Sequence, residues 1–285
     1  MKFKSFHALP SSSLRQLRLL RNAGLLALEP FDYAYRAITC RQHLPPLRLR
    51  RYVGPLRSFE SSSAEFFGYL RDIVGLRPDE SILDIGCGCG SMALQLRNFL
   101  NHDGRYVGVD IHAPSIKWCV KNFSSRHDNF QFTLVDVGNA VFNPDGEPAT
   151  EFRFPYDDGT FDVLLVKSVF THMRAPEVDH YLSEIRRLLN RRGRCLATFF
   201  LLNEKQSVLQ QQGVNQIDFD FGDDVSRYAY KHSPESAVAH RESFVLELLA
   251  KHGLMLMQLV LYGTWSGLRE GLSFQDMLLI QRRPD

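Results

Sequence analysis

Apolar and polar positions follow two alternating periods from about residue 61 onward. Short apolar runs with the length of strands occur at 81–85, 105–110, 130–135, 161–167, 194–202, 254–262 and 275–282. Between most of these runs, apolar residues recur every three or four positions, as on one face of a helix, at 91–101, 113–124, 176–189 and 241–252. This alternation of strands and helices predicts an α/β fold with a doubly wound, mostly parallel sheet.

The two ends of the pattern refine this prediction. Ser61–Ser63 followed by Glu65 indicate the start of a helix whose apolar face ends at Gly75. The last two strand-like runs have no helix between them, which favours an antiparallel hairpin at one edge. The sequence therefore predicts a seven-stranded sheet with an antiparallel C-terminal hairpin.

The N-terminal residues have a different pattern. Over residues 14–28, a helical projection separates a polar side from an apolar side. The polar side holds Arg15, Arg18 and Asn22. The apolar side holds Leu17, Leu20, Ala23, Ala27 and Leu28. Residues 43–57 combine three prolines and a glycine with arginines, which indicates an extended connector. We expect a helical, basic extension over 1–57 and one main domain over 58–285.

Composition and charge narrow the class of protein. A chain of 285 residues that is 44% hydrophobic can bury a real core, so disorder is excluded as its main state. Residues 1–57 hold eleven Lys or Arg against Glu29 and Asp32, a local charge of +9, which leaves −7 for the rest because the whole chain is +2. This basic arm could meet an anionic surface, such as acidic lipid, nucleic acid or a phosphorylated substrate, or pack on the acidic domain.

The location of the protein is constrained by what the sequence lacks. It has no run of about 18 apolar residues that could span a membrane. The helix at 14–28 is expected to lie on an anionic membrane surface or to pack on the domain, and it also has features of a transit peptide. Five cysteines without zinc-site spacing favour a reducing compartment. We predict a cytoplasmic protein, soluble or peripheral at the membrane.

A glycine-rich run follows the first predicted strand, with the sequence Leu83-Asp84-Ile85-Gly86-Cys87-Gly88-Cys89-Gly90. Glycines at a turn from strand to helix let the backbone approach a ligand. A nicotinamide-binding turn would need Gly or Ala at position 91, where Ser91 stands. Asp110 ends the second strand 24 residues beyond Gly86, close to the spacing of an acid that binds ribose hydroxyls.

Together these features resemble the class I S-adenosylmethionine-dependent methyltransferases, which have a Rossmann-like sheet. In that family an acid before the glycines, here Asp84, helps to hold the methionine part of the cofactor. The resemblance also implies that Asp136 binds the adenine amino group, beside the backbone N–H of Val137. It covers about residues 65–202. The candidate residues for the cofactor S-adenosylmethionine are Asp84, Gly86, Cys87, Gly88, Gly90, Asp110, Ile111, Trp118, Asp136, Val137 and Lys167, of which Trp118 is also open to a role in the core.

The reactive group is expected after the fourth strand, in the run Lys167-Ser168-Val169-Phe170-Thr171-His172-Met173. Methyl transfer needs the methyl donor and the acceptor to be aligned, and it needs a proton to be removed from the acceptor. A neutral imidazole can take that proton, so His172 is the candidate base, with a capping or core histidine as the alternative. Related bacterial methyltransferases of glycan and specialised-metabolite pathways carry a similar Ser-Val-Phe-Thr-His-Met stretch.

Two other chemistries are disfavoured by this run. Methylation of a nucleobase amine would call for Asn/Asp-Pro-Pro-aromatic after strand four, which residues 167–170 do not provide. Metal-assisted catalysis would call for clustered carboxylates after strands four and five, so we predict no metal. Nucleic acid is accordingly not favoured as a partner.

The acceptor is expected to bind in a cap, over about residues 203–240, where aromatic rings and polar groups mix. The candidate substrate residues are Arg227, Tyr228, Tyr230 and, between the last two strands, Trp265. The sequence predicts an O-methyltransferase that acts on a hydroxyl of a glycan, glycolipid or small polar metabolite. A methyltransferase of RNA or protein and a non-catalytic cofactor-binding module remain alternatives.

Overall fold

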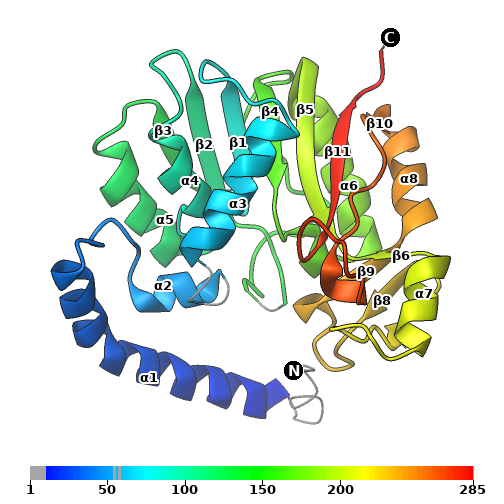
Figure 1. The fold of residues 1–285 in the computed structure, drawn as a ribbon, viewed down its shortest axis with the longest axis horizontal. Helices are drawn as coiled ribbons and strands as arrows, with labels where there is room; N and C mark the ends of the chain where they lie inside the picture. Colours follow the sequence, from blue (N-terminus) through cyan, green and yellow to red (C-terminus); the bar gives the residue numbers. More distant parts are fainter. Residues whose placement is uncertain (1–10, 54–55, 57–58, 141, 285) are drawn as a thin grey trace. The chain divides into compact units, whose positions relative to one another are not determined.

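The structure, a computed structural model, describes residues 11–53, 56, 59–140 and 142–284 (Figure 1), with the side chains of 11–23 left aside. Its main sheet has seven strands in the order β10-β11-β5-β4-β1-β2-β3. They are β1 (Ser81–Ile85), β2 (Arg105–Asp110), β3 (Phe130–Leu134), β4 (Phe161–Val166), β5 (Leu189–Phe199), β10 (Leu254–Leu256) and β11 (Asp276–Arg282). Pairing is parallel except where β11 meets β5 and β10. The predicted sheet with its antiparallel C-terminal edge is confirmed.

Contacts divide the described residues into two compact units, which we treat separately. The N-terminal unit holds residues 8–79 and 87–135, and the C-terminal unit holds 80–86 and 136–285, in each case as far as the structure describes them. The chain passes from one unit to the other between Gly86 and Cys87, inside the glycine-rich turn. The domain boundary expected at residue 57 stays a prediction.

The N-terminal unit is built from helices and the parallel pair β2 and β3. Its helices are α1 (Ser11–Ile38), α2 (Leu47–Tyr52), α3 (Phe59–Asp72), α4 (Ser91–Leu96) and α5 (Ala113–Cys119), which continues as a π-helical turn over Val120–Ser124. A helix over 14–28 is confirmed, and it runs further, through Pro30, to Ile38. Aromatic rings of Tyr106, Phe123 and Phe130 fill the space beside β2.

The extended connector predicted for 43–57 is wrong over residues 47–52, which form α2. Proline is tolerated at a helix start because the first N–H groups have no partner within the helix. Pro46 caps α2, and Leu49 on that helix is buried. Arg50 ties α2 to α1 through an ion pair with Asp32.

The C-terminal unit packs α6 (Ala175–Leu188) and α8 (Glu242–Lys251) with the strands β1, β4, β5, β10 and β11. Both faces of the central strands are apolar, so β4 is buried almost throughout and β5 is buried from Cys195 to Phe199. The strand predicted at 254–262 stops at Leu256, and pairing resumes only as an isolated bridge at Leu261. The strand predicted at 194–202 starts earlier, at Leu189, and is interrupted at Phe200.

The segment expected as a cap is a folded layer with its own sheet. Its four strands are ordered β6-β9-β8-β7, with β6 (Leu201–Leu202), β7 (Phe221–Gly222), β8 (Ser226–Tyr228), β9 (Val238–Arg241), and with helix α7 (Glu204–Gln211). Its core consists of Phe200, Phe219, Ala229, Ala237, Ala239 and Trp265. The buried Asp276 carboxylate accepts hydrogen bonds from Leu201 N, Gly263 N and Trp265 Nε1 at 2.7–2.8 Å. These bonds fix the layer to β11.

Candidate cofactor and active site

The glycine-rich turn has the backbone that its sequence predicts. Gly86, Gly88 and Gly90 have φ values of 77°, 54° and 79°, in the left-handed region where a side chain is strained. A Cβ at Gly86 would lie 2.5 Å from Cγ2 of Val169, and a Cβ at Gly90 would lie 2.8 Å from the ring of Phe123. These positions therefore require glycine for conformation and for space.

Asp110 organises the turn within the N-terminal unit. Its Oδ2 accepts a hydrogen bond from Gly88 N at 2.7 Å, and its Oδ1 accepts one from His112 N at 2.8 Å. The carboxylate is buried, which raises its pKa, while these backbone hydrogen bonds act in the opposite direction. The backbone N–H of Ile111 also donates to this carboxylate. A carboxylate has about four lone-pair sites, so about one remains that can accept a ribose hydroxyl. The residue fits the nucleoside part of S-adenosylmethionine.

The other predicted acids lie in the C-terminal unit. Asp84 is buried in β1, in register with Leu165 of β4. Asp136 is exposed, and its Oδ1 accepts a hydrogen bond from Asn143 Nδ2 at 2.9 Å. The same amide donates to the carbonyl of the buried Val137 at 3.1 Å. A carboxylate accepts hydrogen bonds, and an ammonium group is a charged donor with which it can pair. Asp84 thus suits the methionine end, and the solvent-facing Asp136 suits an amine at the adenine end.

The remaining cofactor candidates stay predictions. Ile111 is half-buried, and so is Trp118, whose ring packs edge-on against Phe123 in the N-terminal unit. Lys167 is half-buried directly after β4. Cys87 is buried, and its sulfur would lie 2.9 Å from a Cβ at Gly108, so this side chain packs on β2 and only its backbone faces the turn.

Ser168, two residues after the end of β4, has a backbone conformation that the sequence does not predict. Its φ is 58°, a left-handed value that costs a non-glycine residue free energy and that gathers at functional sites. The strain is held by a network: Ser168 N donates to Thr198 Oγ1 at 2.7 Å, and Ser168 Oγ lies 2.9 Å from Gln275 Oε1. Thr198 Oγ1 in turn donates to Gln275 Oε1 at 2.6 Å. The chain is thereby turned sharply into the segment that carries His172.

His172 ends the short helix η3 (Phe170–His172). Its Nδ1 lies 2.8 Å from the carbonyl oxygen of Glu235. Because a carbonyl only accepts, Nδ1 carries the proton and Nε2 presents a lone pair. Burial lowers the pKa of His172, so the ring is neutral near pH 7. This state is the one that a general base requires.

The surroundings of His172 hold it in place. Asn139 Nδ2 donates to the His172 carbonyl at 3.0 Å, and the ring of Phe142 packs edge-on against the imidazole. Glu235 belongs to the turn η4 (Pro234–Ser236), and its Oε2 accepts from Ala140 N at 2.5 Å. Three segments distant in sequence therefore meet around this imidazole, all within the C-terminal unit.

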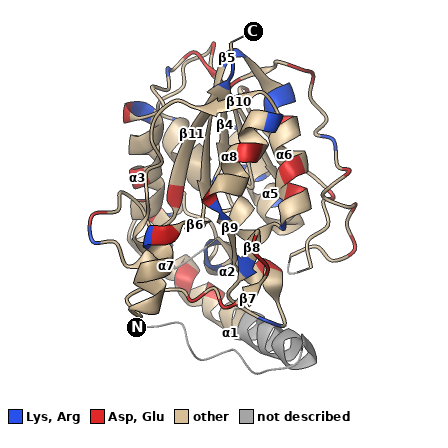
Figure 2. Ribbon diagram, turned by 90° about the vertical axis from the view of Figure 1, so that its right-hand side faces the viewer, with Lys and Arg blue, Asp and Glu red and all other residues tan. Residues whose placement is uncertain are grey.

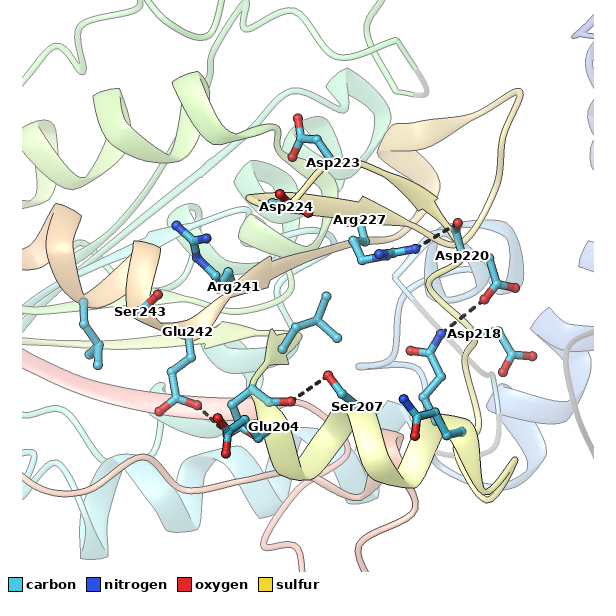
Figure 3. Close-up of a pocket in the computed structure, with 15 residues that line it drawn as sticks. Glu204, Ser207, Asp218, Asp220, Asp223, Asp224, Arg227, Arg241, Glu242 and Ser243 are labelled. Atoms are coloured by element: carbon cyan, nitrogen blue, oxygen red, sulfur yellow. Dashed lines mark hydrogen bonds between the residues drawn. The ribbon is translucent and has the colours of Figure 1, made fainter.

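The cap contains a cavity of about 1100 Å³ that sequence reasoning did not find (Figure 3). Its charged lining residues are Glu204, Asp218, Asp220, Asp223, Asp224, Glu242, Arg227 and Arg241. They come from α7, the strands β8 and β9, the loops beside β8 and the start of α8. Figure 2 colours the acidic and basic residues of the chain on the ribbon. The excess of carboxylates suits hydroxyl or ammonium groups as ligands. The acids at 218–224 are the signal that was available in the sequence.

The predicted substrate residues divide into two groups. Arg227 is exposed and lines the cavity, and its Nε donates to Phe219 O at 2.9 Å. Its Nη2 donates to Asp220 O at 3.1 Å (Figure 3). Tyr228 is half-buried on β8, and Tyr230 packs against the cap core. Trp265 is a correction, because it is 1% exposed and its Nε1 donates to Asp276. Its position supports the cap and does not offer a surface to an acceptor.

A buried histidine next to this region is structural. His240 on β9 is fully buried, and its Nε2 and Nδ1 contact Met173 O at 3.1 Å and Ser226 Oγ at 2.9 Å. Burial lowers its pKa to about 4. Within the described ranges, no group of three or more His, Cys, Asp or Glu side chains is placed to hold a metal ion. Independence from metals nevertheless stays a prediction.

The sheet order, the left-handed glycine turn and the acid that ends β2 define a class I methyltransferase domain. Comparison with known families agrees, since a model described as a methyltransferase domain matches residues 76–222. The chain belongs to this family, and its cofactor is S-adenosylmethionine.

Curated relatives match part of the chain. The eEF1A lysine and N-terminal methyltransferase of Mus musculus is 31% identical over 121 residues, 42% of this chain and 16% of that protein. An uncharacterized 37.1 kDa protein in transposon TN4556 of Streptomyces fradiae is 29% identical over 123 residues, 43% of this chain and 31% of that protein. The matches therefore span less than a third of either relative.

Solved structures share the fold at low identity. The PH0226 protein from Pyrococcus horikoshii OT3 superposes with a TM-score of 0.52 and 18% identity, over 79% of this chain and 91% of that one. The mitomycin 7-O-methyltransferase MmcR also gives a TM-score of 0.52 at 18% identity, over 90% of this chain and 60% of that one. These likenesses establish the fold and leave the acceptor open.

Proposed function

We propose that this protein is an O-methyltransferase that methylates a hydroxyl of a glycan, glycolipid or other small polar metabolite. The observation that carries the proposal is the state of His172. Its Nδ1 proton is engaged by the Glu235 carbonyl, its pKa is lowered by burial, and its Nε2 is left as a base. A hydroxyl needs such a base, because it must lose its proton as the new bond forms.

Each part of the site has one task in this reaction. When bound, S-adenosylmethionine supplies an electrophilic methyl group. Asp84 holds the methionine end, Asp110 the ribose and Asp136 the adenine amine. His172 accepts the acceptor's proton at Nε2, and the Glu235 carbonyl stabilises the resulting imidazolium through Nδ1–H. The strained turn at Ser168 directs the segment that carries this base.

The cap is proposed to bind the acceptor. Strand β9 connects the two features, because His240 contacts Met173 next to the base while Arg241 lines the cavity. Carboxylates such as Asp223 and Glu242 can accept hydrogen bonds from several hydroxyls, and Arg227 can donate to a ring oxygen or an anionic group. A polyhydroxylated molecule matches both.

A second candidate is methylation of a protein amine. The excess of carboxylates around the cavity also suits an ammonium group, and one relative is named as a lysine and N-terminal methyltransferase. An ammonium must lose a proton before it can be methylated, so His172 would have the same task.

The product separates these candidates. Purified protein would be incubated with methyl-labelled S-adenosylmethionine and fractions of glycans, glycolipids, polar metabolites, RNA or protein, and the labelled product would be examined by mass spectrometry and NMR. The proposal expects an O-methyl ether in the small-molecule or glycan fractions. Label on protein nitrogen would support the second candidate and overturn the first. No transfer to any fraction, with intact cofactor binding, would favour a non-catalytic module.

We also propose that α1 contacts an anionic membrane surface from the cytoplasm. Leu28, Phe31, Tyr35 and Ile38 recur at helical spacing on α1, and their exposed fractions are 52%, 74%, 55% and 83%. Among the described helices, none is long and apolar enough to cross a membrane. An exposed apolar face within a basic segment is typical of helices that lie in a membrane interface.

Vesicle sedimentation tests this contact. The full chain should sediment with phosphatidylserine vesicles and not with phosphatidylcholine vesicles, and Phe31→Ser with Ile38→Ser should release it. Leu259→Ser is the matched control, because Leu259 is 89% exposed in the C-terminal unit. Equal sedimentation of both variants, or preferential binding to RNA, would contradict the proposal.

A further inference from the structure

One face of Gly88 in the N-terminal unit is contacted by a residue from outside the glycine turn. A Cβ at Gly88 would collide with Cγ1 of Val53, the residue that follows α2. The Cβ-free face of a glycine in such a turn is the surface that lets a ligand approach the backbone. Val53 therefore lies at the surface that the cofactor needs.

Tyr52, the last residue of α2, lies beside the acid of the same site. Its ring stacks on His112, with 3.8 Å between ring centroids and an interplanar angle of 12°. His112 is fixed, because its N–H donates to Asp110 and its Nδ1 lies 2.7 Å from Ser115 Oγ. Burial and, after it, the Asp110 carboxylate raise the pKa of the Tyr52 phenol. Tyr52 is thus a neutral ring next to the residue that suits the ribose.

The rest of this segment is attached to α1. The Arg50 guanidinium pairs with Asp32 and donates from Nε to Pro45 O at 2.9 Å, and Arg48 pairs with Glu29 at 3.0 Å. The helix is therefore held by polar contacts on one side, while Tyr52 and Val53 contact the cofactor elements. We call residues 47–53 the strap.

We propose that the strap is a wall of the cofactor site, which opens to admit S-adenosylmethionine and closes on it with Tyr52 and Val53 in contact. Both side chains touch elements that hold the cofactor, namely the glycine turn and His112 next to Asp110. The strap belongs to the basic extension, which lies N-terminal to the residues matched by the family model. The inference concerns the cofactor and does not depend on the identity of the acceptor.

Binding of the product cofactor, S-adenosylhomocysteine, tests the contact without any reaction. Calorimetric titration of the full chain should show about 3- to 10-fold weaker binding for Tyr52→Ala, the loss expected for one aromatic contact. Tyr52→Phe keeps the ring and should bind within about twofold of the wild type. Tyr33→Ala, which alters a tyrosine 65% exposed on α1, is the matched control and should not change the affinity. Thermal unfolding without ligand establishes that each variant folds.

Limited trypsin digestion tests closure directly. Saturating S-adenosylhomocysteine should slow cleavage after Arg48, Arg50 and Arg51 severalfold in the wild type, and much less in Tyr52→Ala. Faster cleavage with ligand would mean that the cofactor displaces the strap, which overturns the proposal. Wild-type or tighter affinity in a folded Tyr52→Ala protein would overturn it as well.

Discussion

The glycine turn and the cap handle polar groups in opposite ways. At the turn, the buried Asp110 carboxylate accepts hydrogen bonds from the backbone N–H groups of Gly88 and His112. These bonds fix the loop before a ligand binds. In the cap, carboxylates such as Asp223 and Asp224 are exposed on the wall of a cavity. A preorganised site of the first kind suits one invariable cofactor, whereas the second kind adapts to an acceptor. Substitutions at the glycine turn should therefore change the affinity for the cofactor, and substitutions in the cap should change the KM for the acceptor.

The largest effect is expected at His172, because this residue is proposed to take the acceptor's proton and belongs neither to the glycine turn nor to the wall of the cavity. His172→Ala should lower kcat about 10²–10³-fold, as for loss of a general base, and leave the affinity for S-adenosylhomocysteine within about twofold. Steady-state kinetics and calorimetry measure the two quantities. His102→Ala is the control, because that side chain is 89% exposed. A fall in affinity equal to the fall in kcat would mean that His172 acts on the cofactor site.

Asp110→Ala should produce the complementary result. The backbone N–H groups of Gly88 and His112 lose their acceptor and the cofactor loses its partner, so the affinity for S-adenosylhomocysteine should fall about 100-fold. Calorimetry measures the affinity, and thermal unfolding shows whether the chain still folds. Asp110→Asn keeps one carbonyl acceptor and should bind with intermediate affinity. Unchanged binding in Asp110→Ala would remove this residue from the cofactor site.

The stability of the cap should also decrease at acid pH. The pKa of His240 is lowered from 6.5 to about 4 in the folded state, so the unfolded chain takes up a proton first as the pH falls. The contribution of neutral His240 to the free energy of unfolding is therefore complete above pH 6.5 and is lost between pH 6.5 and about 4. Relative to His240→Gln, the wild type should lose roughly 2–3 kcal/mol of unfolding free energy over this window.

Tryptophan fluorescence isolates that measurement. The chain has two tryptophans, of which Trp265 lies in the cap and Trp118 lies in the N-terminal unit. Urea unfolding in a Trp118→Phe background thus follows the cap alone. The same pH dependence with Gln at position 240 would show that another group titrates.

The smallest effect is expected at the cavity wall. Arg227→Ala should raise the KM for the acceptor about 3- to 10-fold, the loss of one or two exposed hydrogen bonds, and leave cofactor affinity unchanged. Arg192→Ala, at an exposed position of β5, is the matched control. An unchanged KM would place the acceptor elsewhere in the C-terminal unit.

The same two regions differ in how far the sequence predicts them. The glycine turn is local, because the strand period, the three glycines and the acid that ends β2 all lie within a short stretch of sequence. The structure has the turn as predicted. The cap depends on contacts between distant residues, such as Trp265 with Asp276 and His172 with Glu235. No local pattern encodes those pairs, which is why the prediction of Trp265 as a substrate residue is wrong.

The backbone of Ser168 and the helix α2 could not be predicted from the sequence pattern either, because both depend on contacts with distant residues. Ser168 adopts a left-handed backbone because Thr198 on β5 and Gln275 just before β11 hold it there. α2 was missed because prolines and arginines mask a short helix that gains its stability from pairing with α1. In both cases tertiary contacts override local preference.

The pH dependence of kcat tests the central claim most directly, namely that neutral His172 takes the acceptor's proton. Because burial lowers its pKa, the base form persists through neutral pH and is lost on the acid side of 6.5. The wild-type kcat should be level above that point and fall about tenfold per pH unit below the lowered pKa. In His172→Ala, the residual kcat should lack this acid limb. An acid limb that survives in His172→Ala would contradict the account.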